Sequence, residues 1–143
     1  MSALPKKAVI YTDGASSGNP GKSGIGVVIE FGGRTHEISE HIGIATNNIA
    51  EYSALIRGLE RASELGADSV EAFSDSELLV KQLTGVYRVK HENIIPLWKR
   101  ARELSAGFRF FSISHLPRDL NKQADRLSKK AVTLSPEKKA VTS

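Results

Sequence analysis

Hydrophobic and polar residues alternate through the first third of the chain, which is the pattern of strands with one buried face. The segments KKAVIYTDG (6–14), GIGVVIEF (24–31) and RTHEISEHIG (34–43) all show it, and the pair Gly32-Gly33 separates the last two. A glycine pair between two such segments is a signal for a short hairpin. We therefore expect three consecutive and mostly antiparallel strands.

Further along, apolar residues recur with the spacing of helices. Residues 46–66 (TNNIAEYSALIRGLERASELG) place them one turn apart and end at Gly66, a residue type that often follows a helix. The later segments predict a strand at 69–75, helices at 76–85 and 93–105, a strand at 108–116 and a helix at 121–132. This order predicts an α/β fold, with a mixed sheet flanked by helices.

The length of 143 residues, with 40% hydrophobic residues, fits a single domain that fills its own core. We expect that core to span about 6–133 and residues 134–143 to form a flexible tail. No apolar run approaches the roughly 18 residues of a membrane-spanning helix, and no secretory leader is recognisable. The expected location is therefore the cytoplasm, with no membrane partner.

Composition narrows the chemistry that the chain can support. It has no cysteine, which excludes disulfides and thiolate metal sites and leaves histidine and carboxylates as metal ligands. Any metal would be a hard, oxygen-bound ion. The net charge of +4 and a pI near 9.4 favour a polyanionic partner only mildly.

The stretch YTDGASSGNPGKSG (11–24) looks at first like a phosphate-binding loop, because Gly21-Lys22-Ser23 supplies the second half of that pattern. Ser16 stands where the first glycine is required, and Pro20 has no N–H to donate. The residues that follow are β-branched rather than helix-forming. We therefore interpret the stretch as the turn of a hairpin.

Four carboxylates lie in or beside four different predicted elements: Asp13, Glu51, Asp75 and Asp125. Each has an ordinary structural interpretation. Glu51 could form a capping pair with Asn48 at the helix N-cap, and Asp75 lies in SDSE, where Ser74 could be an N-cap. Asp125 could be a polar residue beside an apolar helix stripe.

Considered together, these carboxylates predict a metal site. Asp13 and Asp75 each end a predicted strand, where reactive groups collect in open sheets. Glu51 shares its helix face with apolar residues and should point toward the sheet, where an unpaired charge is costly. Carboxylates without cysteine suit Mg²⁺ or Mn²⁺, and two such ions about 4 Å apart can promote phosphodiester hydrolysis.

The chain resembles the ribonuclease H type 1 family from about Ala8 to Val132, in four motifs that occur in order: YTDGASSGNPGKSGIGVVI, TNNIAEYSALIRGLE, SDSELLVKQL and HLPRDLNKQADRLS. The resemblance implies a ribonuclease H-like fold, with a five-stranded mixed sheet of three antiparallel strands followed by parallel ones. It also implies hydrolysis of the RNA strand of RNA/DNA hybrids, leaving a 5′-phosphate and a 3′-hydroxyl.

The resemblance also assigns roles to residues. It implies two ions, Mg²⁺ or Mn²⁺, with Asp13 bridging both, Glu51 and Asp75 completing one site, and Asp125 serving the other. The turn after Asp13 would meet the minor groove of the hybrid, with little dependence on base identity. The expected nucleic-acid contacts are Gly14, Ala15, Asn19, Thr46, Asn47, Asn48 and Ser76.

Between the two middle helices the chain departs from several bacterial members of the family. It lacks their basic protrusion, so it resembles a compact form. The cations in this region bind phosphate or form a solvated surface, and the two interpretations stay open: Lys81, Arg88, Lys90, Lys99 and Arg100. Trp98 fits the helical spacing of a core residue.

A further catalytic group is expected just before Asp125. Many members of the family carry a mobile histidine there, and His115 fits that spacing. Pro117 restricts the chain beyond it, and strand alternation would pack His115 against the sheet. We therefore favour Arg118 as the cation that assists at the phosphate, with His115 as the alternative.

Two other functions compete with hybrid cleavage. Double-stranded RNA shares the A-form minor groove and is a possible additional substrate. A catalytically silent hybrid-binding module is disfavoured, because such a protein need not keep four carboxylates that repel one another without metal. We expect a monomer, and the choice between Mg²⁺ and Mn²⁺ stays open.

Overall fold

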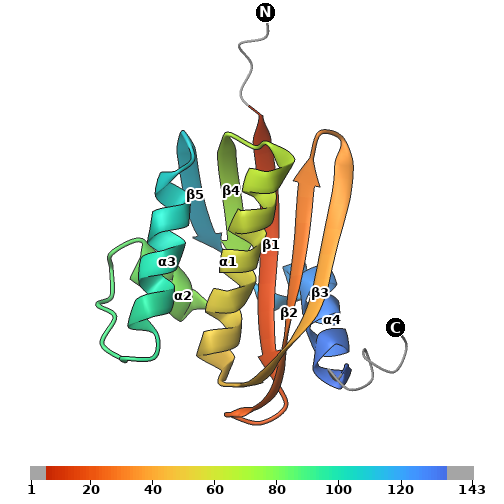
Figure 1. Ribbon diagram of the computed structural model, residues 1–143, viewed down its shortest axis with the longest axis vertical. Helices are drawn as coiled ribbons and strands as arrows, with labels where there is room; N and C mark the ends of the chain where they lie inside the picture. The colour runs from red at the N-terminus through yellow and green to blue at the C-terminus, as the bar shows by residue number, and fades with distance from the viewer. Residues whose placement is uncertain (1–5, 135–143) are drawn as a thin grey trace, which may run out of the picture.

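The computed structural model describes residues 6–134, so the predicted tail at 134–143 lies, except for Leu134, outside the described residues. Within these residues, the chain forms five strands, four α-helices and one short 3₁₀ helix (Figure 1). Their bounds are β1 (Lys7–Ser16), β2 (Gly21–Phe31), β3 (Arg34–Ala45), α1 (Asn47–Leu65), β4 (Ser69–Ser74), α2 (Glu77–Leu83), α3 (Ile95–Ala106), β5 (Phe110–His115), η1 (Arg118–Leu120) and α4 (Lys122–Thr133).

The strands form one mixed sheet in the order β3-β2-β1-β4-β5. The β1–β2 and β2–β3 pairs are antiparallel, whereas β4 pairs in parallel with both β1 and β5. The predicted fold class is therefore confirmed. The tight connection at Gly32 and Gly33, both with positive φ, closes the predicted hairpin between β2 and β3.

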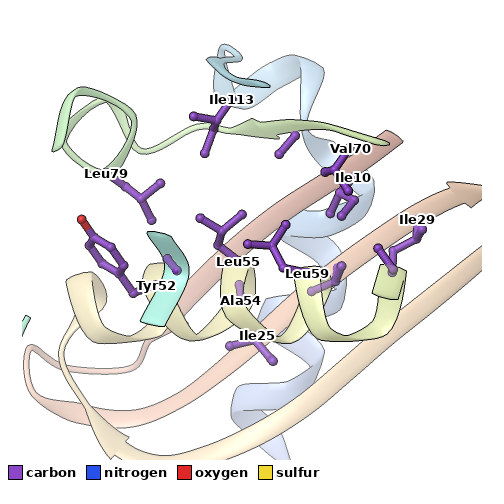
Figure 2. Packing of buried hydrophobic residues seen from close by; sticks show 14 of the residues in the cluster. Ile10, Ile25, Ile29, Tyr52, Ala54, Leu55, Leu59, Val70, Leu79 and Ile113 are labelled. Carbon is purple, nitrogen blue, oxygen red and sulfur yellow. The ribbon is translucent and has the colours of Figure 1, made fainter. Parts of the chain in front are cut away.

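Helices cover the two faces of the sheet unequally. α1 packs on β1 and β2, with α2 and α3 beside it on the same face, while α4 packs alone against β1, β2 and β3 on the other (Figure 1). The main core lies under α1, where Leu55 and Leu59 point toward side chains of β1, β2 and β4 (Figure 2). Trp98 packs against this cluster as predicted, and its indole N–H donates to the Gln82 carbonyl.

On its side of the sheet α4 lies very close to β2. A side chain at Gly26 would overlap the backbone of α4 at Ala124 and Ser128. The buried face of the helix consists of Ala124, Leu127, Ser128 and Ala131. This small-residue contact positions α4 beside Asp13 of β1.

Both predicted N-caps were wrong by two positions. α1 begins one residue after Thr46, whose hydroxyl accepts from the Ile49 N–H, so Asn48 lies within the first turn. α2 is capped by Ser76, which accepts from the Leu79 N–H, while the Ser74 hydroxyl accepts from the Ser76 N–H. Glu51 and Asp75 are therefore not explained by capping.

No helix within residues 6–134 is long and apolar enough to cross a membrane.

Candidate active site

The site begins where the parallel ladder between β1 and β4 ends. The last paired residues of that ladder are Thr12 and Ser74, and the next residue on each chain segment is an aspartate, Asp13 and Asp75. Parallel strands end at the same edge of a sheet, so the two carboxylates are brought together by register alone. The sequence predicted this juxtaposition, but the expectation that Asp13 ends its strand was wrong, because β1 continues to Ser16 through its pairing with β2.

Asp13 is almost completely buried, at 2% relative exposure. The Ser128 hydroxyl on α4 lies 3.0 Å from Asp13 Oδ2 and 2.8 Å from the Asp125 carbonyl oxygen. Ser128 thus ties β1 to α4. Sequence reasoning did not select Ser128, although its position one helical turn after Ala124 and Asp125 was a signal for it.

Glu51 reaches the same place from α1. Its Oε1 accepts a hydrogen bond of 2.5 Å from the Gly14 N–H. A side chain at position 14 would overlap the backbone of Ala50 and lie 2.5 Å from the Glu51 nitrogen. Glycine at this position lets the first turn of α1 approach β1. Gly14 thus has a structural role against α1, and its predicted contact with nucleic acid stays a prediction.

The side chain of Asp75 is only 4% exposed, and its Oδ2 has no hydrogen-bond partner among the described residues. Its nearest cation is Arg118, whose Nε lies 3.8 Å from that oxygen, too far for a hydrogen bond. Arg118 itself is 76% exposed. A buried carboxylate oxygen without a partner is costly unless a cation binds it.

Asp125 lies at the side of this group. Ligand oxygens of Asp13, Glu51 and Asp75 all lie within 4.8 Å of one another, and Asp125 is not one of this trio. It joins the site through a hydrogen bond with Asp13, and Lys129 on the next turn of α4 places its Nζ 3.1 Å from Asp125 Oδ2. The four predicted carboxylates are thus brought together as a buried trio with one neighbour.

Burial and mutual repulsion change the acidity of these groups. The pKa of Asp13 rises to about 7, first because of burial, then because of the charge on Asp75 and a hydrogen bond with Asp125. The pKa of Glu51 is also raised, by burial and then by the charges of Asp13 and Asp75. The pKa of Asp125 is lowered, by the hydrogen bond with Asp13 and by Lys129, against the opposing effect of its burial.

This arrangement fits a divalent cation. The ligands are carboxylate oxygens alone, which suit hard ions such as Mg²⁺ and Mn²⁺. Two of the three carboxylates in the trio have raised pKa values, and the third has an oxygen without a partner. A bound cation would relieve both the repulsion and the missing contact.

A groove with both polar and apolar walls lies between the β1–β2 turn and the start of α1. The Asn19 Oδ1 accepts from the Asn47 N–H at 3.0 Å and so fixes the turn against the helix. The groove encloses about 200 Å³ and is lined by Asn19, Thr46, Asn48, Ile49, His91, Asn93 and Ile94. It brings together three of the seven predicted nucleic-acid contacts, Asn19, Thr46 and Asn48.

His91 and Asn93 were not predicted as parts of this groove. They lie between α2 and α3, and the Asn93 N–H donates to His91 Nδ1. No local motif marks them, because only the packing of this connection beside α1 brings them to the groove. Of the other predicted contacts, Ala15 continues β1 next to Gly14, and Ser76 is the N-cap of α2.

His115 ends β5 and is exposed, so the expectation that it packs against the sheet was wrong. Strand alternation does place it on the face of the buried Ile113, but the core does not extend to the end of this edge strand. Of the two predicted candidates, Arg118 in η1 is the one that the structure brings next to Asp75.

Comparison with known proteins gives consistent matches. The family described as reverse transcriptase-like matches residues 11–131. A protein of Halobacterium salinarum named ribonuclease HI is 46% identical over 124 residues, which cover 85% of this chain and 62% of that protein. A bifunctional protein of Mycobacterium tuberculosis is 41% identical over 129 residues, 88% of this chain and 35% of that protein. The chain therefore spans less than two thirds of the length of these curated relatives.

Solved structures agree in both sequence and shape. The RNase H1 of Halobacterium salinarum superimposes with a TM-score of 0.85 at 44% identity, covering 88% of this chain and 97% of that one. The structure of LC11-RNase H1 in complex with an RNA/DNA hybrid gives a TM-score of 0.81 at 42% identity, covering 87% and 96%.

Proposed function

The chain belongs to the ribonuclease H type 1 family, and on this premise we propose that it is a metal-dependent endoribonuclease that hydrolyses the RNA strand of RNA/DNA hybrids. The products would carry a 5′-phosphate and a 3′-hydroxyl. That it acts as a monomer in the cytoplasm, as one domain with a core at about 6–133, stays a prediction.

One observation carries the proposal: one buried and two partly buried carboxylates converge at the end of the β1–β4 ladder, and Asp75 Oδ2 has no hydrogen-bond partner among the described residues. A silent binding module has no need of such a costly group. We propose that Asp13, Glu51 and Asp75 hold one Mg²⁺ or Mn²⁺ and that Asp13 and Asp125 hold a second. When bound, the two ions lower the pKa of the attacking water and stabilise the leaving oxygen.

The side chains around the carboxylates would position the reacting groups. Ser128 fixes the Asp13 carboxylate against α4, and the Gly14 N–H fixes Glu51. Arg118 is exposed and lies beside Asp75, so its guanidinium can contact the scissile phosphate without losing much hydration. Arginine stays protonated at neutral pH, so this contact is electrostatic and does not transfer a proton.

The groove at Asn19, Thr46, Asn48 and Asn93 would hold the substrate duplex beside the carboxylates. Its polar side chains carry no net charge and suit sugar and base edges of the minor groove, where a 2′-hydroxyl distinguishes RNA from DNA. The hybrid present in the LC11-RNase H1 complex supports this choice of substrate. Because few such contacts depend on base identity, we expect cleavage at many sequences.

The test is a cleavage assay with end-labelled RNA in three forms: hybrid, double-stranded and single-stranded. Each is incubated with Mg²⁺, with Mn²⁺ and with EDTA. The expected result is metal-dependent cleavage of the hybrid, and its loss in Asp13→Asn. Asp119→Asn is the matched control, because it removes the same charge from an exposed carboxylate in η1, outside the buried trio.

Binding of the hybrid without cleavage under all metal conditions would contradict the proposal and favour a silent module. Cleavage of double-stranded RNA at a rate comparable with that of the hybrid would show that double-stranded RNA is also a substrate. Cleavage that is equally fast in Asp13→Asn would show that the carboxylates are not the catalytic centre.

A further inference from the structure

α4 presents a stripe of cations to solvent on the side opposite its buried face. Lys122, Arg126 and Lys130 recur every fourth residue and are exposed. At 1.5 Å per residue, the stripe is about 12 Å long. None of the three forms an ion pair within residues 6–134, whereas Lys129 beside them is paired with Asp125.

The other helices pair four of their six cations with carboxylates, and Arg102 of α3 lies over the Trp98 ring. Arg57 of α1 pairs with Glu40, Lys81 of α2 with Glu77, and Arg100 of α3 with both Glu60 and Glu103. α4 has four cations and a single carboxylate, Asp125, which gives it a net charge of +3 in a chain whose total is +4. A surface helix that served only solubility would not need this excess of positive charge.

The position of the stripe relative to the carboxylates is specific. Asp125, which neighbours the trio, immediately precedes Arg126 on α4 and pairs with Lys129, so the stripe lies on the same turns of α4 as this fourth carboxylate. The groove lined by Asn19 and Asn93 lies by α1, whereas α4 packs on the opposite face of the sheet. A duplex whose scissile phosphate lies at the trio thus has the groove on one side and the α4 stripe on the other.

We propose that Lys122, Arg126 and Lys130 form a second phosphate-binding surface, which contacts the nucleic-acid backbone beyond the scissile phosphate on the α4 side. The inference depends on the proposed function, since it needs a duplex at the trio. The stripe is comparable in length to the axial rise of about three nucleotides, at 3.4 Å each. Its contacts are purely electrostatic, so they raise affinity without distinguishing RNA from DNA.

The test measures binding of a fluorescent RNA/DNA hybrid in EDTA, where no cleavage occurs, as a function of salt concentration. The double variant Arg126→Glu/Lys130→Glu is compared with Arg34→Glu/Arg109→Glu, which makes the same charge change at two exposed arginines away from the site. Each lost phosphate contact reduces the slope of log K against log salt by about 0.9. We expect the α4 variant to lose close to two units of slope, and the control to lose much less.

A DNA duplex of the same sequence should lose the same slope in the α4 variant, because the contacts are to phosphate. The melting temperatures of both variants report whether they are folded. The inference would be overturned if the slope of log K against log salt fell equally in the α4 and control variants. It would also be overturned if the slope were unchanged in a folded α4 variant. Either result would leave the proposed function intact. Wild-type protein that fails to bind the hybrid at low salt would overturn both.

Discussion

Asp13 lies at the centre of the site's electrostatics. It is buried, it is held by Ser128, and its pKa is raised to about 7 by burial and then by Asp75 and Asp125. In the unfolded chain its pKa is near 3.8. The folded, metal-free protein therefore keeps a proton on this group at pH values where the unfolded chain has released it.

We predict that Asp13→Asn stabilises the metal-free protein increasingly as the pH rises from 4 to 8. Because the pKa of Asp13 is raised in the folded state, the wild-type protein loses stability as the pH rises from about 4 to about 7. The neutral amide of asparagine does not titrate, so the variant does not have this loss. Each pKa unit corresponds to about 1.4 kcal/mol, so the gain should be between about 1 and 4 kcal/mol at pH 8. Urea unfolding in EDTA at a series of pH values measures it, and a difference from wild type that does not vary with pH would contradict the prediction.

Arg118 and His115 compete for one role, and the geometry favours Arg118. We expect Arg118→Ala to lower turnover of saturating hybrid by about tenfold or more, equivalent to about 1.4 kcal/mol, because it removes the cation beside Asp75. His115→Ala should change turnover less than threefold. The reverse order in single-turnover rates would assign the role to the histidine.

At the scale of the elements, the contact between β1 and α1 controls the site. We predict that Gly14→Ala destabilises the fold by about 1–3 kcal/mol, because the added methyl group overlaps the backbone of Ala50 and Glu51. Gly85→Ala is a useful comparison: φ there is 84°, but the new methyl group meets no atom among the described residues. Denaturant midpoints that fall equally in both variants would mean that the α1 contact is not tight.

The elements show why some features could be predicted from the sequence. Alternation and helical period determine which faces of β1 and α1 are buried, so the convergence of Asp13, Glu51 and Asp75 follows from the end of the β1–β4 ladder and one helix face. The N-cap of α1 was mistaken because several polar residues in succession can each cap a helix. The actual choice, Thr46, also depends on the contact between Asn19 and Asn47, which local rules do not include.

Two other features could not be predicted from the sequence, because they depend on how the elements pack. His115 shares a strand face with a core residue, yet it is exposed because the core ends before β5 does. The groove residues His91 and Asn93 are distant in sequence from the motifs that they join. Their role depends on the path of the connection between α2 and α3, which no periodicity describes.

At the scale of the whole molecule, metal binding should be coupled to stability. We predict that millimolar Mg²⁺ or Mn²⁺ raises the melting temperature of the wild-type protein, because ions bind the folded carboxylate trio and not the unfolded chain. At a hundred times its Kd, one ion adds about 2.7 kcal/mol. Asp13→Asn should abolish most of the shift. A wild-type melting temperature that does not change with metal in differential scanning calorimetry would rule out this coupling.

The contact between Ser128 and Asp13 also has a consequence for biosynthesis. The two residues are 115 positions apart, and α4 follows every other described element along the chain. Chains fold during translation from the N-terminal side, so the sheet can form on the ribosome before α4 is available. Asp125 and the support for Asp13 would then be missing. Under the proposed function, a nascent chain would therefore complete its second metal site only when α4 docks.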